Sequence, residues 1–331
     1  MPATAQKIVQ LSSAEGTWGS TGAMVTKLHG VTDANFKINS TVETVPSLGW
    51  FGPSPVAQEQ AHSGEGRIEM VTSYEEMPRI VNMFFTAIGA STSVGAPYNY
   101  PYTAPVTSTQ AVFTYTLGLG STASAYNAPG SIGKHLNIRG EAGGFWNTRM
   151  DFLAQRITVA STGMAAQADR TVNPVRMADT TLYVDAFSTG TVGGTSVSAT
   201  LIAFELDIET NRHLKLFAGS ISPANWGEGK HEVTLRVTAE INASAKALVD
   251  ELLGSTGAAV SRQIRIGATQ GSAASLRTFN LDFAGIKSEG ETLFSDRDGN
   301  MTVELSWQGR YSTGLSNWFA TNIQNGSSST T

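Results

Sequence analysis

The clearest pattern in the chain is a strict alternation of apolar and acidic residues over positions 204–209, Phe-Glu-Leu-Asp-Ile-Glu. A period of two predicts a β-strand with one buried face and one solvated face. The apolar members are expected to face a core, and Glu205, Asp207 and Glu209 to face water.

A second strand and a helix follow this first strand. Residues 232–241 alternate in the same way. Asn242 or Ser244 can then cap a helix for which Gly254 is a suitable stop. The predicted unit is therefore strand, polar loop, strand and helix.

The same succession of landmarks occurs twice along the chain. The matched segments are 16–21 with 190–195, the strands at 36 and 204, 64–67 with 227–230, the helices at 77 and 245, 134–138 with 262–266, and 150–153 with 281–284. The repetition predicts two tandem domains, 1–165 and 166–331, each mainly β with one flanking helix. Two unrelated β domains that share a turn vocabulary remain the alternative.

Two stretches depart from this pattern. Residues 90–130 are rich in Ser, Thr, Gly, Pro and Tyr, and are expected to form a surface excursion with one strand at 111–117. Residues 324–331 form a low-complexity tail that is expected to be flexible.

Composition narrows the classes of function. The net charge of -5 gives no electrostatic reason to bind nucleic acid from outside. With no cysteine, the chain can form neither disulfides nor thiolate metal sites, and it has no cysteine nucleophile. No signal peptide or membrane-spanning run is visible, which predicts synthesis in a cytoplasm.

The sequence motifs that could indicate a catalytic or metal site are better explained by structural roles. Residues 296–300, Asp-Arg-Asp-Gly-Asn, lack the glycine position and closing glutamate of a calcium loop, and predict a hairpin turn before a strand at 301–308. The five histidines show no ligand spacing, and no nucleophile elbow or phosphate loop is present. We therefore expect no enzyme, no cofactor and no metal site.

Aromatic residues in the predicted loops are more informative. Trp50 and Phe51 lie in a Pro-rich loop. The triplet Gly-Glu-Gly occurs at 64–66 and again at 227–229, and Trp226 precedes the second triplet. Such residues either fold back onto the core or dock on a partner, and the sequence leaves both open.

Taken together, these motifs resemble a known family. Residues 204–209, 227–230, 281–285 and 296–311 resemble the tail tube (major tail) proteins of long-tailed, siphovirus-type bacteriophages, as do residues 64–67 and 74–78. The resemblance implies a β-sandwich or partial barrel flanked by a helix. It also implies that copies form stacked rings, which make a tube for DNA ejection into the host.

The resemblance implies partners and a location as well. The chain would associate with itself, with a tape measure protein and with tail terminator and tip proteins, and would reside in the virion after synthesis in the host cytoplasm. Viral DNA would pass without specific binding. Because the fold occurs twice in the chain, three chains would complete a ring with pseudo-six-fold symmetry.

The expected site residues follow from the alternation and the resemblance together. Those expected to face the lumen are Glu205, Asp207, Glu209, Glu232, Arg236, Lys37 and Asn39. Those expected at contacts between subunits or rings are Trp50, Phe51 and Trp226, within or beside the loops 46–61 and 211–225. A solvated outer surface is the alternative for the charged face.

Two rival functions remain at this stage. A surface or adhesive β-sandwich binding protein would share the fold class, although neither a signal peptide nor a cysteine supports it. A tail-associated polysaccharide hydrolase would need a pair of carboxylates in an aromatic cleft, for which the sequence gives no sign.

Overall fold

The structure is a computed structural model of the chain. It describes residues 8–44, 57–85, 98–104, 106, 112–121, 124–160, 164, 166–187, 190, 192–197, 201–254, 260–272, 275–288, 292–297 and 299–326. Trp50 and Phe51 therefore lie outside the described residues.

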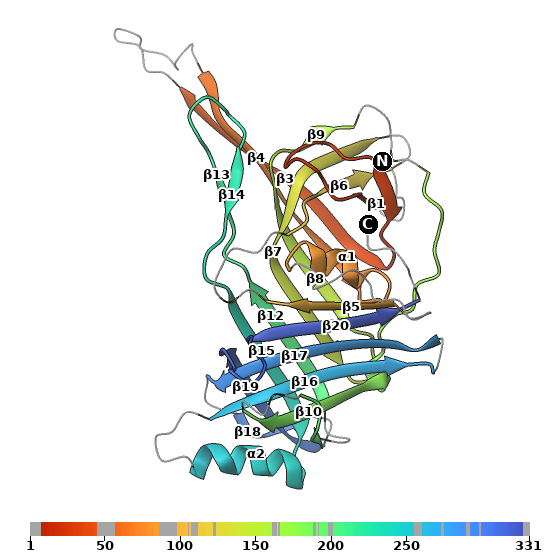
Figure 1. The fold of residues 1–331 in the computed structure, drawn as a ribbon, viewed down its shortest axis with the longest axis vertical. Helices are drawn as coiled ribbons and strands as arrows, with labels where there is room; N and C mark the ends of the chain where they lie inside the picture. The colour runs from red at the N-terminus through yellow and green to blue at the C-terminus, as the bar shows by residue number, and fades with distance from the viewer. Residues whose placement is uncertain are drawn as a thin grey trace.

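A long antiparallel sheet runs through the whole molecule (Figure 1). Its strands, in spatial order, are β3 (Val31–Thr44), β4 (Ala57–Val71), β8 (Asn147–Ala154), β7 (Ala125–Glu141), β12 (Leu201–Glu209), β15 (Glu232–Glu240), β19 (Asn300–Gly309) and β18 (Thr292–Arg297). Since β7 belongs to the first half of the chain and β12 to the second, their pairing makes the sheet continuous across both halves.

The predicted alternation along β12 is confirmed. Phe204, Leu206 and Ile208 are 3% exposed or less, whereas the acidic residues between them are partly exposed. Burial of three such side chains stabilises the fold by about 1.5–3 kcal/mol each, which fixes the register because a slip of one residue would expose all of them.

Further strands build two smaller sheets against this core. One contains β11 (Ser196–Val197), β10 (Thr180–Ala186), β16 (Ser261–Gln270), β17 (Arg277–Lys287), β20 (Phe319–Asn325) and β5 (Tyr98–Thr103). The other contains β2 (Met24–Lys27), β1 (Ile8–Ser12), β6 (Tyr115–Gly120), the first part of β7 and β9 (Thr158–Val159). A 3₁₀ turn spans Met177–Asp179, and β13 (His213–Lys215) pairs with β14 (Asn225–Gly227) in a separate hairpin.

Both predicted helices are present. Helix α1 spans Met77–Asn82, with a proline in its first turn, and its residues are buried. Helix α2 spans Ala243–Gly254 and is capped by Asn242, whose Oδ1 accepts the Ala245 N–H at 2.9 Å. Asn242, rather than Ser244, is therefore the cap.

The strand pairings of the first half recur in the second half. Each of seven pairs in the first half has a counterpart in the second. They are β1·β2 with β10·β11, β1·β6 with β10·β16, β6·β7 with β16·β17, β7·β8 with β17·β19, β4·β8 with β15·β19, β3·β4 with β12·β15, and β7·β9 with β17·β20. In this correspondence β7 matches β17, and β8 matches β19. The sequence matches of 134–138 with 262–266 and of 150–153 with 281–284 are therefore each displaced by one strand, because similar short alternations do not distinguish neighbouring strands.

The stretch at 90–130 is not simply a surface excursion. It contributes β5, β6 and the start of β7, and Tyr100, Tyr102, Tyr115 and Leu117 are buried. The strand expected at 111–117 begins instead at Tyr115.

The tail also begins later than expected. Strand β20 continues to Asn325, whose side-chain amide donates to the backbone carbonyl of Tyr74 at 2.6 Å. Residues 327–331 lie outside the described residues.

The hairpin expected from residues 296–300 is confirmed. Strands β18 and β19 pair down to Arg297 and Asn300, and Gly299 adopts a positive φ of 82°. The Gly299 N–H donates to Asp296 Oδ1 at 2.9 Å, which closes the turn. Among the described residues, no helix is long and apolar enough to cross a membrane.

Candidate functional site: the polar face of the long sheet

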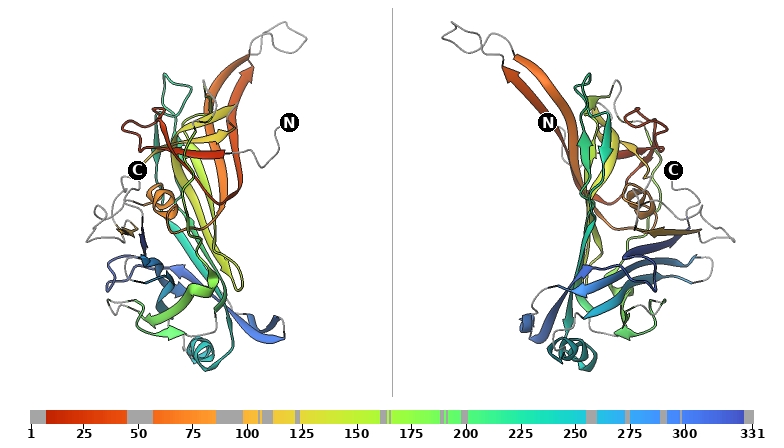
Figure 2. Two further views of the ribbon diagram at one scale, coloured as in Figure 1. Left: turned by 90° about the vertical axis from the view of Figure 1, so that its right-hand side faces the viewer. Right: turned by 60° about the vertical axis from the view of Figure 1, so that its left-hand side comes forward.

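The long sheet has one apolar face and one polar face. Figure 2 shows α1 and the smaller sheet that contains β16, β17 and β20 on one side of it. The opposite side carries the charged residues that alternate with the core positions. The exposed fractions of the Glu205 and Asp207 side chains, 42% and 49%, show that this polar face is open to solvent in a single chain.

The strand register brings the expected lumen residues onto this one face. Glu205 lies opposite Arg236, and Glu209 lies opposite Glu232, across β12 and β15. Strand β3 contributes Lys37 and Asn39, which lie opposite Glu65 and Ser63 of β4. Intervening strands β8 and β7 connect these two groups through antiparallel pairs, so all seven residues share the face.

Sequence reasoning missed the contribution of β4, β7, β8 and β19 to the same face. The charged residues that these strands add are Glu65, Arg67, Glu69, His135, Arg139, Glu141, Arg149, Asp151 and Glu304, and Asp33 of β3 lies on the same face. The face is therefore a mixed pattern of charges in which acids outnumber bases. Only the pairing of strands far apart in the sequence reveals it.

Most basic groups of the face are paired with carboxylates. Lys37 Nζ lies 2.6 Å from Glu65 Oε1, and the Arg236 guanidinium lies 4.0 Å from the Glu205 carboxylate. Asp151 accepts hydrogen bonds from Arg67 Nε at 2.9 Å and, within β8, from Arg149 at 3.0 Å. Cross-strand ion pairs of this kind leave few isolated positive charges.

His135 lies at the centre of the face, where the two halves of the chain meet. Its Nδ1 lies 3.4 Å from Asp151 Oδ2, and its Nε2 pairs with Asp207 Oδ1. Asp151 first and Asp207 second raise the pKa of His135 to about 9, which keeps the imidazole charged at neutral pH. A cation from β7 thus links carboxylates on β8 and β12.

Both carboxylates respond to this arrangement. Burial alone would raise the pKa of Asp151, but the nearby His135 imidazole and hydrogen bonds from Arg149 and Arg67 outweigh it and lower that pKa well below its usual value. Burial acts in the same direction on Asp207, and His135 again outweighs it, so that the pKa of Asp207 is also lowered. The cluster is therefore ionised throughout the neutral range.

The charged face is hollowed in one region. This depression is lined by charged residues of both signs, among them Arg139, Glu141, Glu205, Arg236 and Glu304. Within the described part of the chain, no group of three or more acidic or histidine side chains could hold a metal ion. The geometry suits a charged wall rather than a binding pocket.

Trp226 occupies a partly buried position in β14. The Arg212 guanidinium lies over its ring, 5.3 Å from the centroid, in a cation–π contact. One side of this aromatic residue therefore packs within the chain.

Arg212 is a buried structural residue to which no sequence motif pointed. Its side chain is fully buried and donates to the carbonyl oxygens of Met83 and Phe84, just beyond α1, at 2.7 and 2.8 Å. It donates to the Gly133 carbonyl at 2.9 Å as well. An arginine of the second half thus binds the C-terminal end of the first helix, where the helix dipole favours a cation.

The second Gly-Glu-Gly triplet supplies the counter-charge. Glu228 Oε1 accepts hydrogen bonds from Arg212 Nη2 at 2.9 Å and from His231 Nε2 at 2.8 Å. Burial would raise the pKa of Glu228, but these two partners outweigh it and lower the pKa. The triplet therefore places a buried carboxylate, in addition to providing close backbone approach.

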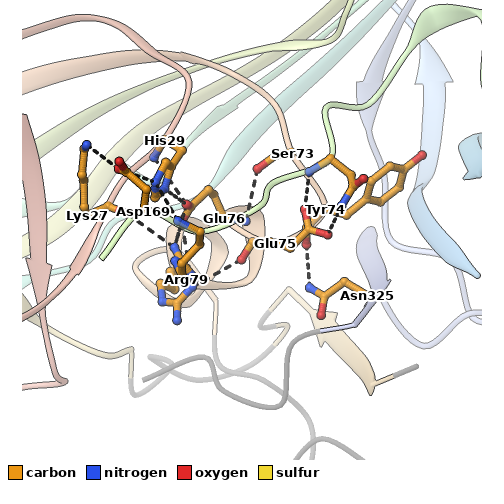
Figure 3. A network of polar contacts seen from close by, with 11 residues as sticks. Lys27, His29, Ser73, Tyr74, Glu75, Glu76, Arg79, Asp169 and Asn325 are labelled. Carbon is orange, nitrogen blue, oxygen red and sulfur yellow. Dashed lines mark hydrogen bonds and ion pairs between the residues drawn. The ribbon is translucent and has the colours of Figure 1, made fainter. Parts of the chain in front are cut away.

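A second buried network joins the N-terminus of α1 to the linker between the halves (Figure 3). Glu76 is fully buried and accepts hydrogen bonds from Arg170 at 2.7 and 2.8 Å, with His29 Nδ1 at 3.1 Å. Neighbouring Glu75 accepts from Arg277 of β17 at 3.0 Å. The two adjacent glutamates at the start of α1 therefore anchor separate elements to one another.

Comparison with known proteins agrees with this architecture. Residues 5–309, which include parts of every strand of the long sheet, match the family described as phage tail tube protein. The chain belongs to the phage tail tube protein family. No curated protein sequence matches it.

Membership confirms the resemblance and the mainly β sandwich class expected from the sequence. The tail tube family is one of structural virion proteins of the phage tail and is not an enzyme family. The charged face of this tail tube protein is therefore to be interpreted as part of an assembly. Its paired charges fit that role.

Proposed function

We propose that copies of this tail tube protein form rings that stack into a tube, through which viral DNA passes during ejection into the host. The observation that supports this proposal most is that one sheet crosses both halves of the chain without a break, and the β7·β12 pairing joins the halves. A ring of such sheets would make a continuous wall. Tape measure, terminator and tip proteins are the further partners that this assembly would require.

The polar face is proposed to line the lumen. Glu205, Asp207 and Glu209 then face the DNA, with Glu232 and Arg236 beside them and Lys37 and Asn39 on the other half. A protein holds DNA when its cations replace phosphate counterions. Here most of the cations are already paired with carboxylates, so passing DNA would find few sites on which to stall.

Three chains per ring are proposed, since each chain would supply two equivalent units. The recurring strand pairings support this interpretation. Two glycines add to it, because Gly19 and Gly193 hold the same place in the matched turns and both adopt a positive φ. Each also donates its N–H to a carboxylate, Gly19 to Glu15 at 3.1 Å and Gly193 to Asp185 at 2.7 Å.

The two hairpins between the matched strands are proposed to contact the next ring. Strands β3 and β4 form one, which carries Trp50 and Phe51 in its connection; β13 and β14 lie within the other, which carries Trp226. Figure 1 shows both hairpins at the same end of the molecule. The second exposes Leu216, Phe217 and Ile221 by 50–58%, an apolar cluster that a neighbour would cover.

Electron microscopy of the purified protein and of virions tests the proposal. Stacked rings of three chains, with β12 on the inner wall, are the expected result. Rings of six chains would contradict the trimer, and β12 on the outer surface would contradict the lumen assignment. A chain that stays monomeric at high concentration would contradict the proposed function as a whole.

The inter-ring contact has its own test. Replacing Leu216, Phe217 and Ile221 together with serine should leave rings that no longer stack into long tubes. Val159→Ser, at a residue 77% exposed on β9, is the matched control and should leave tubes intact. Tubes of normal length from the triple variant would show that this hairpin is not needed.

A further inference from the structure

We infer that the outer face of the sheet formed by β10, β16, β17, β20 and β5 is a binding surface for a neutral glycan chain of the host cell surface. These five strands lie side by side across the lower half of the molecule (Figure 1). The face lies on the other side of the molecule from the polar face of the long sheet, so it takes no part in the proposed lumen.

The strand register defines this surface, called the glycan face below. The residues that point away from the core form three rows across the strands: Tyr183, Arg265, Asp282, Ala320 and Thr103; Thr181, Gly267, Asn280, Asn322 and Pro101; and Thr269, Thr278, Gln324 and Asn99. The residues that alternate with them, such as Leu182, Ile266 and Leu281, are buried in the core. All members of the rows except Gly267 are partly or fully exposed.

The glycan face carries almost no free charge. Its one ion pair joins Arg265 to Asp282 through two hydrogen bonds of 2.6 and 2.8 Å. Most of the other residues are amides, hydroxyls and small side chains. A nucleic acid needs cations that can replace phosphate counterions, and the single guanidinium here is already held by a carboxylate. The face therefore matches an uncharged ligand.

The glycan face also lacks the centre of a protein interface. None of the large apolar side chains that the described residues expose lies on it. Stable protein contacts are built around a core that is apolar or aromatic. A sugar chain offers instead many hydroxyl groups that both donate and accept hydrogen bonds, and amides and hydroxyls match both roles.

The amides of the face have hydrogen-bonding capacity to spare. No described residue forms a hydrogen bond with the side chain of Asn99, Asn280 or Asn322. Tyr183, near one border of the face, supplies an aromatic ring against which the C–H groups of a sugar can pack. The four strand spacings from β10 to β5 extend about 19 Å, which gives room for a short oligosaccharide.

The matched face of the first half is covered by the chain itself. There Gly118 lies opposite Asn127, as Gly267 lies opposite Asn280 in the second half. A Cβ on Gly118 would come within 3.1 Å of the side chain of Met164, which belongs to the linker between the halves. The three atoms nearest to a Cβ on Gly267 all belong to side chains of the glycan face. Of these two related faces, the described chain covers the first and leaves the second open.

Repetition along a tube would strengthen a weak contact with a long polymer. Each chain carries one glycan face, so the proposed tube would present many copies, and linked weak sites bind a polymer far more tightly than one site. Only this gain rests on the proposed assembly, because a single chain already has the whole face.

Affinity electrophoresis of the unassembled full chain tests the glycan face. Native gels contain mannan, dextran or laminarin, which are neutral, or heparin, which is anionic. At least one neutral polysaccharide should slow the chain, and heparin should not. Tyr183→Ala combined with Asn280→Ala should weaken the binding about tenfold, because one ring contact and one amide hydrogen bond are lost together.

The first half offers a matched control. Tyr126→Ala with Asn127→Ala removes the same two side-chain types, the tyrosine being 47% exposed and the asparagine the counterpart of Asn280. This variant should bind the polysaccharide as the native chain does. Circular dichroism and tube formation establish that both double variants are folded.

Each outcome for the glycan face is separate from tube assembly. Migration unchanged by all three neutral polysaccharides would overturn glycan binding, and so would stronger retardation by heparin. Retardation that survives the substitutions at Tyr183 and Asn280 would overturn its placement on this face. If that variant does not fold, Asn280→Asp decides, since an added charge of the same shape should also weaken binding, and unchanged binding would overturn the placement.

Assembled tubes show whether a second copy of the chain occupies the face instead. Tubes should bind the same polysaccharide more tightly than the single chain. Binding by the single chain that disappears in tubes would show that a neighbour covers the face, and would overturn its role on the virion surface. Normal tubes without any glycan binding would leave the proposed assembly intact.

Discussion

At the scale of single residues, burial decides which charges matter. Arg236 and Arg212 both pair with a glutamate, yet Arg236 is half exposed and Arg212 is fully buried. An exposed pair contributes about 0–1 kcal/mol, because water competes for both groups. Removing one partner of a buried pair leaves the other charge unsatisfied, which costs about 3–5 kcal/mol.

Arg212→Met should therefore lower the free energy of unfolding by about 3–5 kcal/mol, with loss of the bonds to the end of α1 and of the partner of Glu228. Urea unfolding of the unassembled chain measures the effect. The matched control Arg236→Met should change stability by less than about 1 kcal/mol. Adding Glu228→Gln to Arg212→Met should restore part of the loss, and equal effects of the two arginine variants would contradict this account.

His135 should make stability sensitive to alkaline pH. Its pKa is raised in the folded chain, from an ordinary value of 6.5 to about 9. The stabilisation is therefore complete below about 6.5 and is lost as pH rises through about 9. Urea midpoints between pH 7 and pH 10 should fall in the native chain, and fall less in His135→Gln.

The acid limb of the same cluster has the opposite sign. The pKa values of Asp151 and Asp207 are lowered, so their stabilisation is present above the ordinary value and is lost as pH falls through the folded values.

His62→Gln is the control for the alkaline prediction on His135, since His62 lies away from this cluster beside Glu59. An identical alkaline slope in the native chain and in His135→Gln would show that His135 does not carry the effect.

At the scale of elements, the two Gly-Glu-Gly triplets have different structural roles. The second triplet places Glu228 against Arg212. The first lies within β4, where a Cβ on Gly66 would come within 2.5 Å of both the Phe152 ring and the Asn35 carbonyl oxygen. The strand therefore needs glycine there because its neighbours leave no room.

Gly66→Ala should cost about 1–3 kcal/mol, because β3 or the Phe152 ring must shift to admit the methyl group. Thermal unfolding of the unassembled chain gives the measurement. Gly16→Ala is the control, since nothing lies within 4 Å of its added Cβ. A Gly66→Ala chain as stable as Gly16→Ala would show that the close packing is not maintained in solution.

At the scale of the whole molecule, the balance of charge on the polar face is expected to set how DNA moves. Replacing Glu205, Asp207 and Glu209 with lysine would add six positive charge units per chain to the wall, counting three anions lost and three cations gained. DNA would then find phosphate-binding groups, and its ejection should become slower at low salt and recover as salt rises.

Ejection from virions that carry this triple variant, measured over a range of salt, tests the expectation. Asp250→Lys on α2 serves as a control for added positive charge away from the face. An ejection rate and salt dependence unchanged by the triple variant would contradict the placement of these residues in the lumen.

The sequence alone determined the features that depend on neighbours along the chain. The alternation in β12 and β15, the start of α1 at Met77, the Asp-Gly turn before β19 and the family itself all follow from short segments. Local periodicity carries this information because each residue's face is set by its own strand.

Only the tertiary structure decided how the strands meet. The displacement of two landmark matches, the buried strands within 90–130 and the charged pairs around His135 all depend on contacts between distant segments. Arg212 shows the reason most clearly. Its contribution to stability comes from hydrogen bonds to carbonyl groups 128 and 129 positions earlier in the chain. No pattern around residue 212 specifies which backbone carbonyls will lie beside the arginine.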